Sequence, residues 1–335
     1  MSDIRIRVAA GTDVGLVRTN NEDNFVVCPD LNVSDWTIPQ ANKVVGLGSY
    51  GSLLVVADGM GGANAGEVAS AIAVESVQKR FTEEALASAV ASDEAIQDFL
   101  VSVVKEADLN ILNAAKENVE HAGMGTTIVM AWIIGAKAYI CWCGDSRCYV
   151  FNPKQGLTQL SKDHSFVQEL VDRGELEPEN MHDHPYSNVI TRCLSDGEQR
   201  AVPEVRLYNL QVGDLLLLCS DGLSSVSTDD QILEVLKNRG EKELMQVKEE
   251  LIKAALDAGG YDNVTVALCE VLPSADENTD EAVEEPQPMV STVTTAPAKS
   301  KVGYWLRVLL FLVLTVAVIL WLVNPDLMKT WFHLQ

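Results

Sequence analysis

Residues 53–62 read LLVVADGMGG, an apolar run that ends on Asp58 beside a glycine. A strongly apolar run next to an aspartate recurs three times, in 139–147 (YICWCGDSR, Asp145), 215–223 (LLLLCSDGL, Asp221) and 259–268 (GGYDNVTVAL, Asp262). One Asp-Gly pair by itself indicates only a turn. Several carboxylates are costly to bury together, however, unless cations neutralise them. Four aspartates at the margins of buried strands therefore predict a shared cation site.

The type of ligand restricts the type of ion. Carboxylate and carbonyl oxygens suit Mg²⁺ or Mn²⁺, whereas zinc sites use histidine and cysteine. All five histidines lie outside these four segments (His121, His164, His182, His184 and His333). A further acidic pair, Glu22-Asp23, follows Arg18 in the segment VRTNNEDNF.

The pattern of apolar residues predicts an α+β fold. Period-two runs predict strands at 25–28, 53–57, 126–134, 137–142, 148–151, 205–208, 214–219 and 264–271. Three- and four-residue spacing predicts helices at 63–80, 83–119, 229–238 and 241–258. Short turns between neighbouring strands favour antiparallel hairpins. Grouped strands with paired helices favour layered α+β architecture over a regular βαβ repeat.

The composition excludes several classes of protein. The 335 residues carry 25 Lys+Arg against 48 Asp+Glu, a net charge of −23, which argues against nucleic-acid binding through phosphate neutralisation. A chain that is 47% apolar packs rather than staying disordered. The seven cysteines are odd in number, lack CxxC spacing and lie partly in apolar runs, which predicts buried thiols in a reducing compartment.

The C-terminal region predicts a membrane anchor. Residues 304–323 (YWLRVLLFLVLTVAVILWLV) contain one charge, and a helix of 20 residues covers about 30 Å, the thickness of a bilayer core. Residues 272–303 are acidic and then rich in Pro and Thr, which predicts a flexible linker. Basic residues gather before the span, so we expect residues 1–271 in the cytoplasm and 324–335 outside, in a single-pass protein of the cell membrane. The N-terminus lacks the apolar core of a signal peptide.

The motifs, taken in order, resemble the metal-dependent (type 2C) serine/threonine protein phosphatases, and most closely their bacterial members. The resemblance rests on VRTNNEDNF, VADGMGG, GMGTT, CGDSR, KDHS, NVITR, CSDGL and YDNVT, and it covers about residues 8–271. It implies a four-layer α-β-β-α sandwich of two antiparallel sheets flanked by helix pairs, with metal ions at one end. We expect one C-terminal transmembrane helix in addition.

The resemblance also implies roles for individual residues. Asp58 would bridge two Mn²⁺ or Mg²⁺ ions, and the carbonyl of Gly59 would bind the second. Asp221 and Asp262 would bind the first ion, while Glu22 and Asp23 would hold water bound to the metals. Asp145, with Asp221, would hold a third, weaker ion, and Arg18 would bind the substrate phosphate. A hydroxide bridging two ions would attack phosphorus without a covalent phosphoenzyme.

Several other positions leave alternatives open. Asp163 and His164 either take part in catalysis or form an ordinary loop pair, and Asn263 either orients Asp262 or caps a turn. Some family members carry a histidine directly after the Asp-Gly pair, as an acid for the leaving group. Here that position is Met60, so water or another group such as His184 would serve.

Two segments are also left open. A polar segment at about 165–195 resembles the family's variable flap. Residues 29–52 form an insert whose Trp36 and Tyr50 dock either on the body or on a partner.

The sequence thus predicts a membrane-anchored signalling hydrolase that dephosphorylates phosphoserine and phosphothreonine in protein targets of a serine/threonine kinase. The alternative is a catalytically weak or inactive module of the same fold that binds phosphoproteins at the membrane. Under either interpretation, the predicted partners of the chain are phosphorylated proteins and the lipid bilayer, and not nucleic acid.

Overall fold

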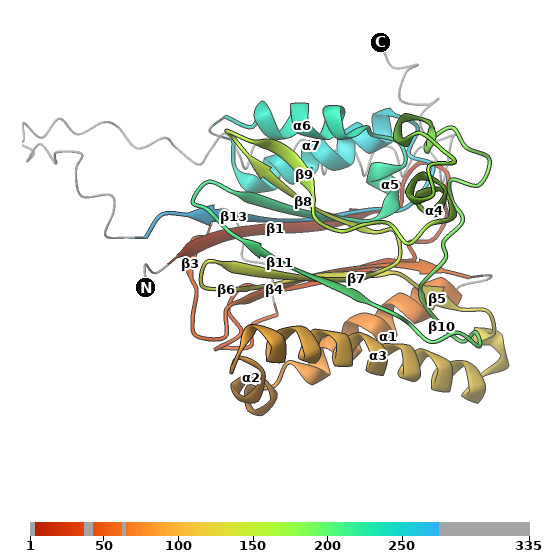
Figure 1. Ribbon diagram of the computed structural model, residues 1–335, viewed down its shortest axis with the longest axis horizontal. Helices are drawn as coiled ribbons and strands as arrows, with labels where there is room; N and C mark the ends of the chain where they lie inside the picture. The colour runs from red at the N-terminus through yellow and green to blue at the C-terminus, as the bar shows by residue number, and fades with distance from the viewer. Residues whose placement is uncertain (1–3, 37–42, 62–64, 241, 275–335) are drawn as a thin grey trace, which may run out of the picture. The chain divides into compact units, whose positions relative to one another are not determined.

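Two antiparallel sheets lie face to face, and each carries helices on its outer face (Figure 1). The structure is a computed structural model that describes residues 4–36, 43–61, 65–240 and 242–274. The predicted transmembrane helix 304–323, the tail 324–335 and the linker beyond residue 274 lie outside the described residues. Within the described residues, no helix combines the length and the apolar character needed to cross a bilayer.

The strands form one six-stranded and one seven-stranded sheet. The first has the order β3 (Val45–Gly46), β1 (Arg5–Asp13), β13 (Val264–Leu272), β12 (Leu215–Cys219), β8 (Arg147–Asn152) and β9 (Gly156–Gln159). The second has the order β10 (Leu194–Ser195), β5 (Gly125–Thr126), β4 (Ser52–Met60), β6 (Ile128–Ile134), β7 (Lys137–Cys143) and β11 (Glu204–Asn209), with β2 (Asp23–Cys28) paired to β4.

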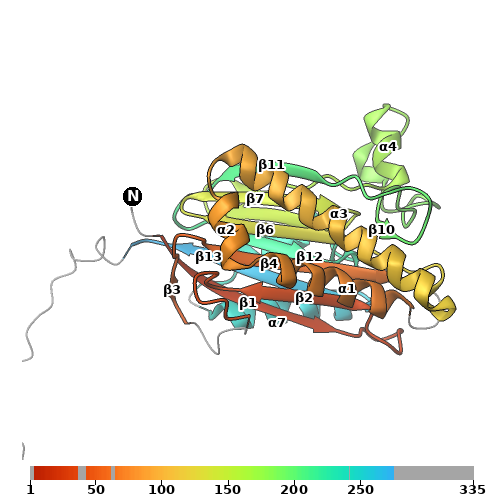
Figure 2. The ribbon, with the colours of Figure 1, turned by 90° about the horizontal axis from the view of Figure 1, so that it is seen from below.

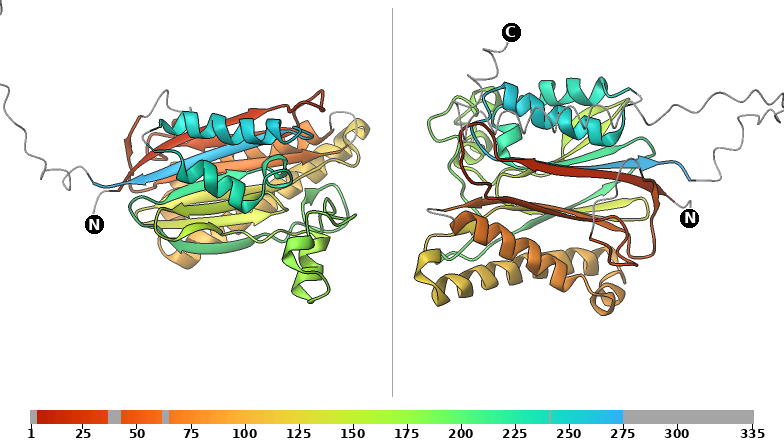
Figure 3. Two further views of the ribbon diagram at one scale, coloured as in Figure 1. Left: turned by 90° about the horizontal axis from the view of Figure 1, so that it is seen from above. Right: turned by 180° about the vertical axis from the view of Figure 1, so that it is seen from behind.

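The helices divide between the two outer faces. The second sheet carries α1 (Ala65–Arg80), α2 (Glu83–Ala89) and α3 (Asp93–Glu117), as the view from below shows (Figure 2). The first sheet carries α5 (Asp221–Ser224), α6 (Asp229–Lys237) and α7 (Leu244–Asp257), which the view from above shows (Figure 3). The short α4 (Phe166–Asp172) belongs to the connection between β9 and β10.

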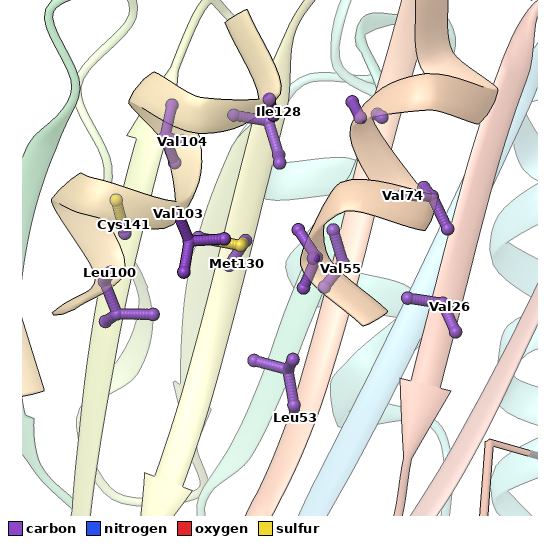
Figure 4. Packing of buried hydrophobic residues seen from close by; sticks show 14 of the residues in the cluster. Val26, Leu53, Val55, Val74, Leu100, Val103, Val104, Ile128, Met130 and Cys141 are labelled. Carbon is purple, nitrogen blue, oxygen red and sulfur yellow. The ribbon is translucent and has the colours of Figure 1, made fainter. Parts of the chain in front are cut away.

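Three apolar cores separate these four layers. Strand β4 shows the cause, because its side chains alternate in direction. Leu53 and Val55 pack toward α1 and α3, and Figure 4 shows them there with Val74 and Val103. The alternate residues Leu54 and Val56 pack instead into the core between the sheets. A third core lies between the first sheet and helices α5 to α7. The predicted four-layer α-β-β-α arrangement of two antiparallel sheets flanked by helices is therefore confirmed.

Some predicted elements were wrong or missing. The single helix predicted over 83–119 is two helices, because Val90 caps the end of α2 and the Ser92 hydroxyl accepts from Ala95 N–H to begin α3. Strand β1 was not predicted, although it pairs with β13 along all nine of its residues. The segment 165–195, predicted only as a polar flap, contains α4.

The described parts of the insert, 29–36 and 43–52, dock on the body. Trp36 and Tyr50 both pack against the core between α1 to α3 and the second sheet, and the indole N–H of Trp132 donates to the carbonyl of Tyr50 at 2.8 Å. Strand β3, near the end of the insert, pairs with β1. All seven cysteines are free thiols, and six of them are buried.

Candidate active site

The acidic residues singled out in the sequence meet at one end of the sandwich, on the right-hand side of Figure 1 near α5 and β5. Asp58 lies near the end of β4, and Asp23 begins β2 directly opposite it. Asp221 begins α5 just after β12. Asp145 and Asp262 stand two residues from the ends of β7 and β13. Antiparallel pairing within each sheet and the stacking of the two sheets bring these five positions together from five separate regions of sequence.

The backbone of Asp58 is fixed by two buried threonines. Its N–H donates to the Thr127 hydroxyl at 3.0 Å. Its carbonyl accepts from the Thr127 N–H and from the Thr126 hydroxyl, each at 2.9 Å. Burial raises the pKa of Asp58 well above its ordinary value, and the charges of Asp23 and Asp221 raise it further.

Two buried carboxylate oxygens point at no donor. Asp23 accepts from the hydroxyls of Ser220 and Thr265 through Oδ2, at 2.7 and 2.6 Å, whereas its Oδ1 is unpartnered among the described residues. Oδ1 of Asp145 is buried and unpartnered in the same way. Burial raises the pKa of Asp23 to about 7 and that of Asp145 to about 8. Orphaned carboxylate oxygens in such a cluster fit a hard divalent cation.

The acidic residues suit a metal ion in the type of their ligand atoms and in their position in the fold. In the described part of the chain, no three His, Cys, Asp or Glu side chains are already arranged to hold a metal ion. Asp23 accepts from the hydroxyls of Ser220 and Thr265 instead, and Asp262 accepts from Arg18. Side chains of this cluster would therefore turn toward a bound ion.

The loop after β1 forms one rim of the site. The Arg18 guanidinium donates to Oδ2 of Asp262 at 2.7 Å, and its side chain is 53% exposed. Asn263 holds this loop: its Oδ1 accepts from the Glu22 N–H at 2.8 Å, and its Nδ2 donates to the carbonyls of Val14 and Asn20. Asn263 thus orients the loop that carries Arg18 and Glu22, rather than capping a turn.

Close backbone packing joins this loop to β4 and α1. The carbonyl of Glu22 accepts from the Gly59 N–H at 3.1 Å and from the Ser70 hydroxyl at 2.6 Å. A Cβ atom on Gly59 would lie 2.2 Å from the carbonyl oxygen of Gly66 and 2.5 Å from that of Glu22. Only glycine fits at this crossing. Desolvation raises the pKa of the Glu22 carboxyl, while Arg18 opposes that shift.

Asp163 and His164 brace the turn that carries Asp145. Asp163 accepts three hydrogen bonds from Arg147, at 2.7 to 3.0 Å. His164 Nδ1 accepts from the Gly144 N–H at 3.1 Å, and its ring stacks on Trp142 with centroids 6.1 Å apart. Burial lowers the pKa of His164, so the ring is neutral. This pair holds residues 144–147 in place.

His184 is not among the residues that line a cleft together with Asp145, Asp221 and Asp262. Its ring packs with those of Phe166 and Tyr186, at centroid distances of 6.4 and 5.7 Å, within the 165–195 segment. Met60 ends β4, and its Cγ lies 3.4 Å from the position of a Cβ on Gly125. The structure therefore does not bring His184 to the site as a proton donor.

Sequence reasoning missed the groups that hold the acids. Buried hydroxyls in otherwise apolar strands support the carboxylates and their backbone (Thr126, Thr127, Ser220 and Thr265). Arg147 belongs to the motif CGDSR, but the sequence alone did not predict its ion pair with Asp163. A polar residue within an apolar run could have indicated these supporting hydroxyls, because a buried hydroxyl needs a hydrogen-bond partner.

A cleft of about 870 Å³ opens from the acidic cluster. Asp145, Asp221 and Asp262 line one part of it. Its other walls come from the 165–195 segment and from the first turn of α6, including Glu179, Asp229 and Asp230. Substrate could reach the acidic cluster through this cleft.

Comparison with known proteins finds one family. The family model described as "Protein phosphatase 2C" matches residues 43–259. The serine/threonine phosphatase stp of Listeria monocytogenes is 34% identical over 259 residues, which are 77% of this chain and 93% of the relative. The phosphatase PstP of Mycobacterium tuberculosis is 35% identical over 267 residues. That match covers 80% of this chain but only 45% of PstP, so the chain spans less than half of that relative.

A solved structure extends the comparison to the metal. The catalytic domain of PstP in complex with two manganese ions matches with a TM-score of 0.63 and 33% identity, over 80% of this chain and 99% of the solved one.

Proposed function

Because this chain belongs to the protein phosphatase 2C family of serine/threonine protein phosphatases, we propose that it hydrolyses phosphoserine and phosphothreonine in phosphorylated proteins. The observation that carries the proposal is the cluster of buried carboxylates around Asp58, with orphaned oxygens on Asp23 and Asp145. A cluster of this kind is costly without cations, since Asp23, Asp58 and Asp145 form no ion pair among the described residues.

Manganese or magnesium is the cofactor of this proposal. Asp58, Asp221, Asp262 and the Gly59 carbonyl would hold two ions, with Glu22 and Asp23 nearby, and Asp145 with Asp221 would hold a third. The ions would supply Lewis-acid activation of the attacking water near neutral pH. Family membership and the manganese-bound PstP domain support this assignment of metal.

The chain's own groups would orient the substrate. Arg18 sits at the rim of the site, half exposed, and its planar guanidinium can donate two parallel hydrogen bonds to phosphate oxygens. Asn263 keeps Arg18 and Glu22 in register by holding their loop at both ends. Thr126 and Thr127 keep the Asp58 backbone fixed.

Two parts of the proposal concern where and on what the enzyme acts. The apolar span predicted at 304–323 would anchor the chain in the cell membrane with the phosphatase domain in the cytoplasm, near substrates of a serine/threonine kinase. Carbonate extraction tests the anchor: the full chain should stay in the membrane pellet, and a chain ending at residue 300 should be released. Retention of the shorter chain would count against the span.

Phosphate release tests the activity. The full-length chain in mild detergent should hydrolyse a phosphothreonine peptide with Mn²⁺ and should lose that activity in EDTA. Asp58→Asn and Asp262→Asn should each lower turnover at least about a hundred-fold. Turnover that persists in EDTA would contradict the proposal. Tight peptide binding without turnover would instead support the alternative, a phosphoprotein-binding module.

A further inference from the structure

The cleft that leads away from the acidic cluster carries far more negative than positive charge. Seven carboxylates and one guanidinium line it. We propose that this cleft selects phosphoprotein segments in which lysine or arginine flanks the phosphorylated residue. The inference rests on the proposed phosphatase function, and it assigns to Glu179 and Asp230 the role of contacting those basic flanks.

The carboxylates that line the cleft are of two kinds: some belong to the proposed metal site or pair with Arg147, and others are available to a substrate. Asp145, Asp221 and Asp262 belong to the proposed metal site. Asp163 is neutralised by its three hydrogen bonds from Arg147, which is the one guanidinium in the lining. The charges of these four carboxylates are therefore largely balanced, by the proposed metal ions or by Arg147, and would attract the flanks of a substrate only weakly.

The remaining carboxylates are Glu179, Asp229 and Asp230. Asp229 accepts from the Tyr149 hydroxyl at 3.0 Å and lies 3.9 Å from the Arg147 guanidinium, so it is partly compensated. Glu179 and Asp230 are exposed, and neither forms an ion pair within the described residues. They come from two different elements, Glu179 from the 165–195 segment and Asp230 from the first turn of α6.

One end of the cleft is the acidic cluster, where the phosphate would react. Asp145 is only 8% exposed, its Oδ1 is unpartnered among the described residues, and it lines the same cleft as Glu179 and Asp230. His182 lines the cleft too, with its Nε2 bonded to the carbonyl of Ser225. A polypeptide whose phosphate reaches the acidic cluster would therefore pass its flanking residues through a cleft lined by these two uncompensated carboxylates.

Charge complementarity identifies the occupant. Lysine or arginine in the flanks would be attracted by Glu179 and Asp230, while aspartate or glutamate in the flanks would be repelled. Exposed ion pairs are individually weak, so the expected preference is modest and depends on salt.

The test compares two phosphothreonine peptides of equal length, one with arginine and one with glutamine on both sides of the phosphothreonine. The full-length chain with Mn²⁺ is used at low ionic strength, and p-nitrophenyl phosphate serves as a substrate without flanks. We expect kcat/KM to favour the arginine peptide about five-fold. The double variant Glu179→Gln/Asp230→Asn should bring the two peptides within two-fold, and Glu179→Lys/Asp230→Lys should reverse the preference.

The matched control is Glu177→Gln, which removes one charge from the same segment but does not line the cleft. It should keep the preference of the parent chain, and all variants should hydrolyse p-nitrophenyl phosphate equally. If the parent chain hydrolyses p-nitrophenyl phosphate but treats both peptides alike, the inference is wrong and the phosphatase assignment stands. If the parent chain cleaves neither kind of substrate, the phosphatase assignment itself fails.

Discussion

Asp23 and Asp58 are direct cross-strand partners on β2 and β4; Asp23 is buried and Asp58 is half-buried. Like charges directly opposite each other destabilise a pair of strands. Hydroxyls of Ser220 and Thr265 satisfy one oxygen of Asp23, but no cationic side chain of the described residues neutralises the two acids. The pair therefore links folding, protonation and metal binding in this protein.

The first prediction concerns the pH dependence of the metal-free protein. The pKa of Asp23 is about 7 and that of Asp145 about 8, both raised by burial from 3.8. The native state then binds more protons than the unfolded state between about pH 4 and pH 8, so stability falls as pH rises through that window. For Asp23 alone the loss is on the order of 4 kcal/mol.

Thermal unfolding in EDTA at pH 5, 6, 7 and 8 measures this effect. The Tm should fall with rising pH in EDTA, and saturating Mn²⁺ should remove the fall. Asp23→Asn should make the EDTA profile less steep because one of the two titrating groups is gone. A metal-free Tm that is constant or increases over this range would show that these carboxylates are not buried as described.

The second prediction concerns the crossing at Gly59. Gly59→Ala places a methyl group against two carbonyl oxygens, and it should lower the free energy of unfolding by about 3 kcal/mol. Urea unfolding measures the loss. Gly46→Ala is the control, because a Cβ there meets no atom within 4 Å, and it should change stability little. Equal stabilities for the two variants would rule out the close approach.

The third prediction concerns the Arg147–Asp163 ion pair. Its side chains are 20% and 7% exposed, so removing one partner leaves a buried charge. Asp163→Ala should cost about 3–5 kcal/mol in urea unfolding. The surface pair Lys79–Glu75, with side chains 74% and 61% exposed, provides the comparison. Glu75→Ala should cost less than about 0.5 kcal/mol, and similar losses at both pairs would contradict this account.

The fourth prediction concerns phosphate binding by Arg18. Arg18→Ala should lower kcat/KM for p-nitrophenyl phosphate about 10- to 100-fold, because charge-assisted hydrogen bonds to the phosphate are lost. Arg18→Lys should recover part of the activity, since a lysine keeps the charge but not the planar fork. Arg173→Ala removes a comparable charge outside the cleft and should leave kcat/KM unchanged. An Arg18→Ala variant that matches this control would exclude a role in phosphate binding.

The acidic cluster could be predicted from the sequence because its aspartates lie at the ends of strands, which are recognisable as apolar runs. Each aspartate stands beside a run that is too apolar to lie at the surface, so the sheet itself brings the carboxylates together. Strand β1 could not be found in the same way. Its residues Ala9, Ala10 and Gly11 have weak strand propensity, and it forms because β13 pairs with it along its whole length.

Roles that depend on distant partners were beyond the sequence. His164 is explained by its contact with the Gly144 N–H, and Asn263 by its bonds to Val14 and Asn20, which are about 240 residues away. Helix propensity also failed to reveal the break before α3, since residues 83–119 keep helical spacing throughout. Only the hydroxyl cap at Ser92 marks it.

The central claim is that the carboxylates around Asp58 form a divalent metal site. Equilibrium binding of Mn²⁺ to the full-length chain, followed by isothermal titration calorimetry at pH 7.5, tests it most directly. We predict at least two bound ions per chain, and a loss of at least one in Asp58→Asn, whereas Glu177→Gln keeps them all. Unchanged binding of Mn²⁺ by Asp58→Asn would contradict the account.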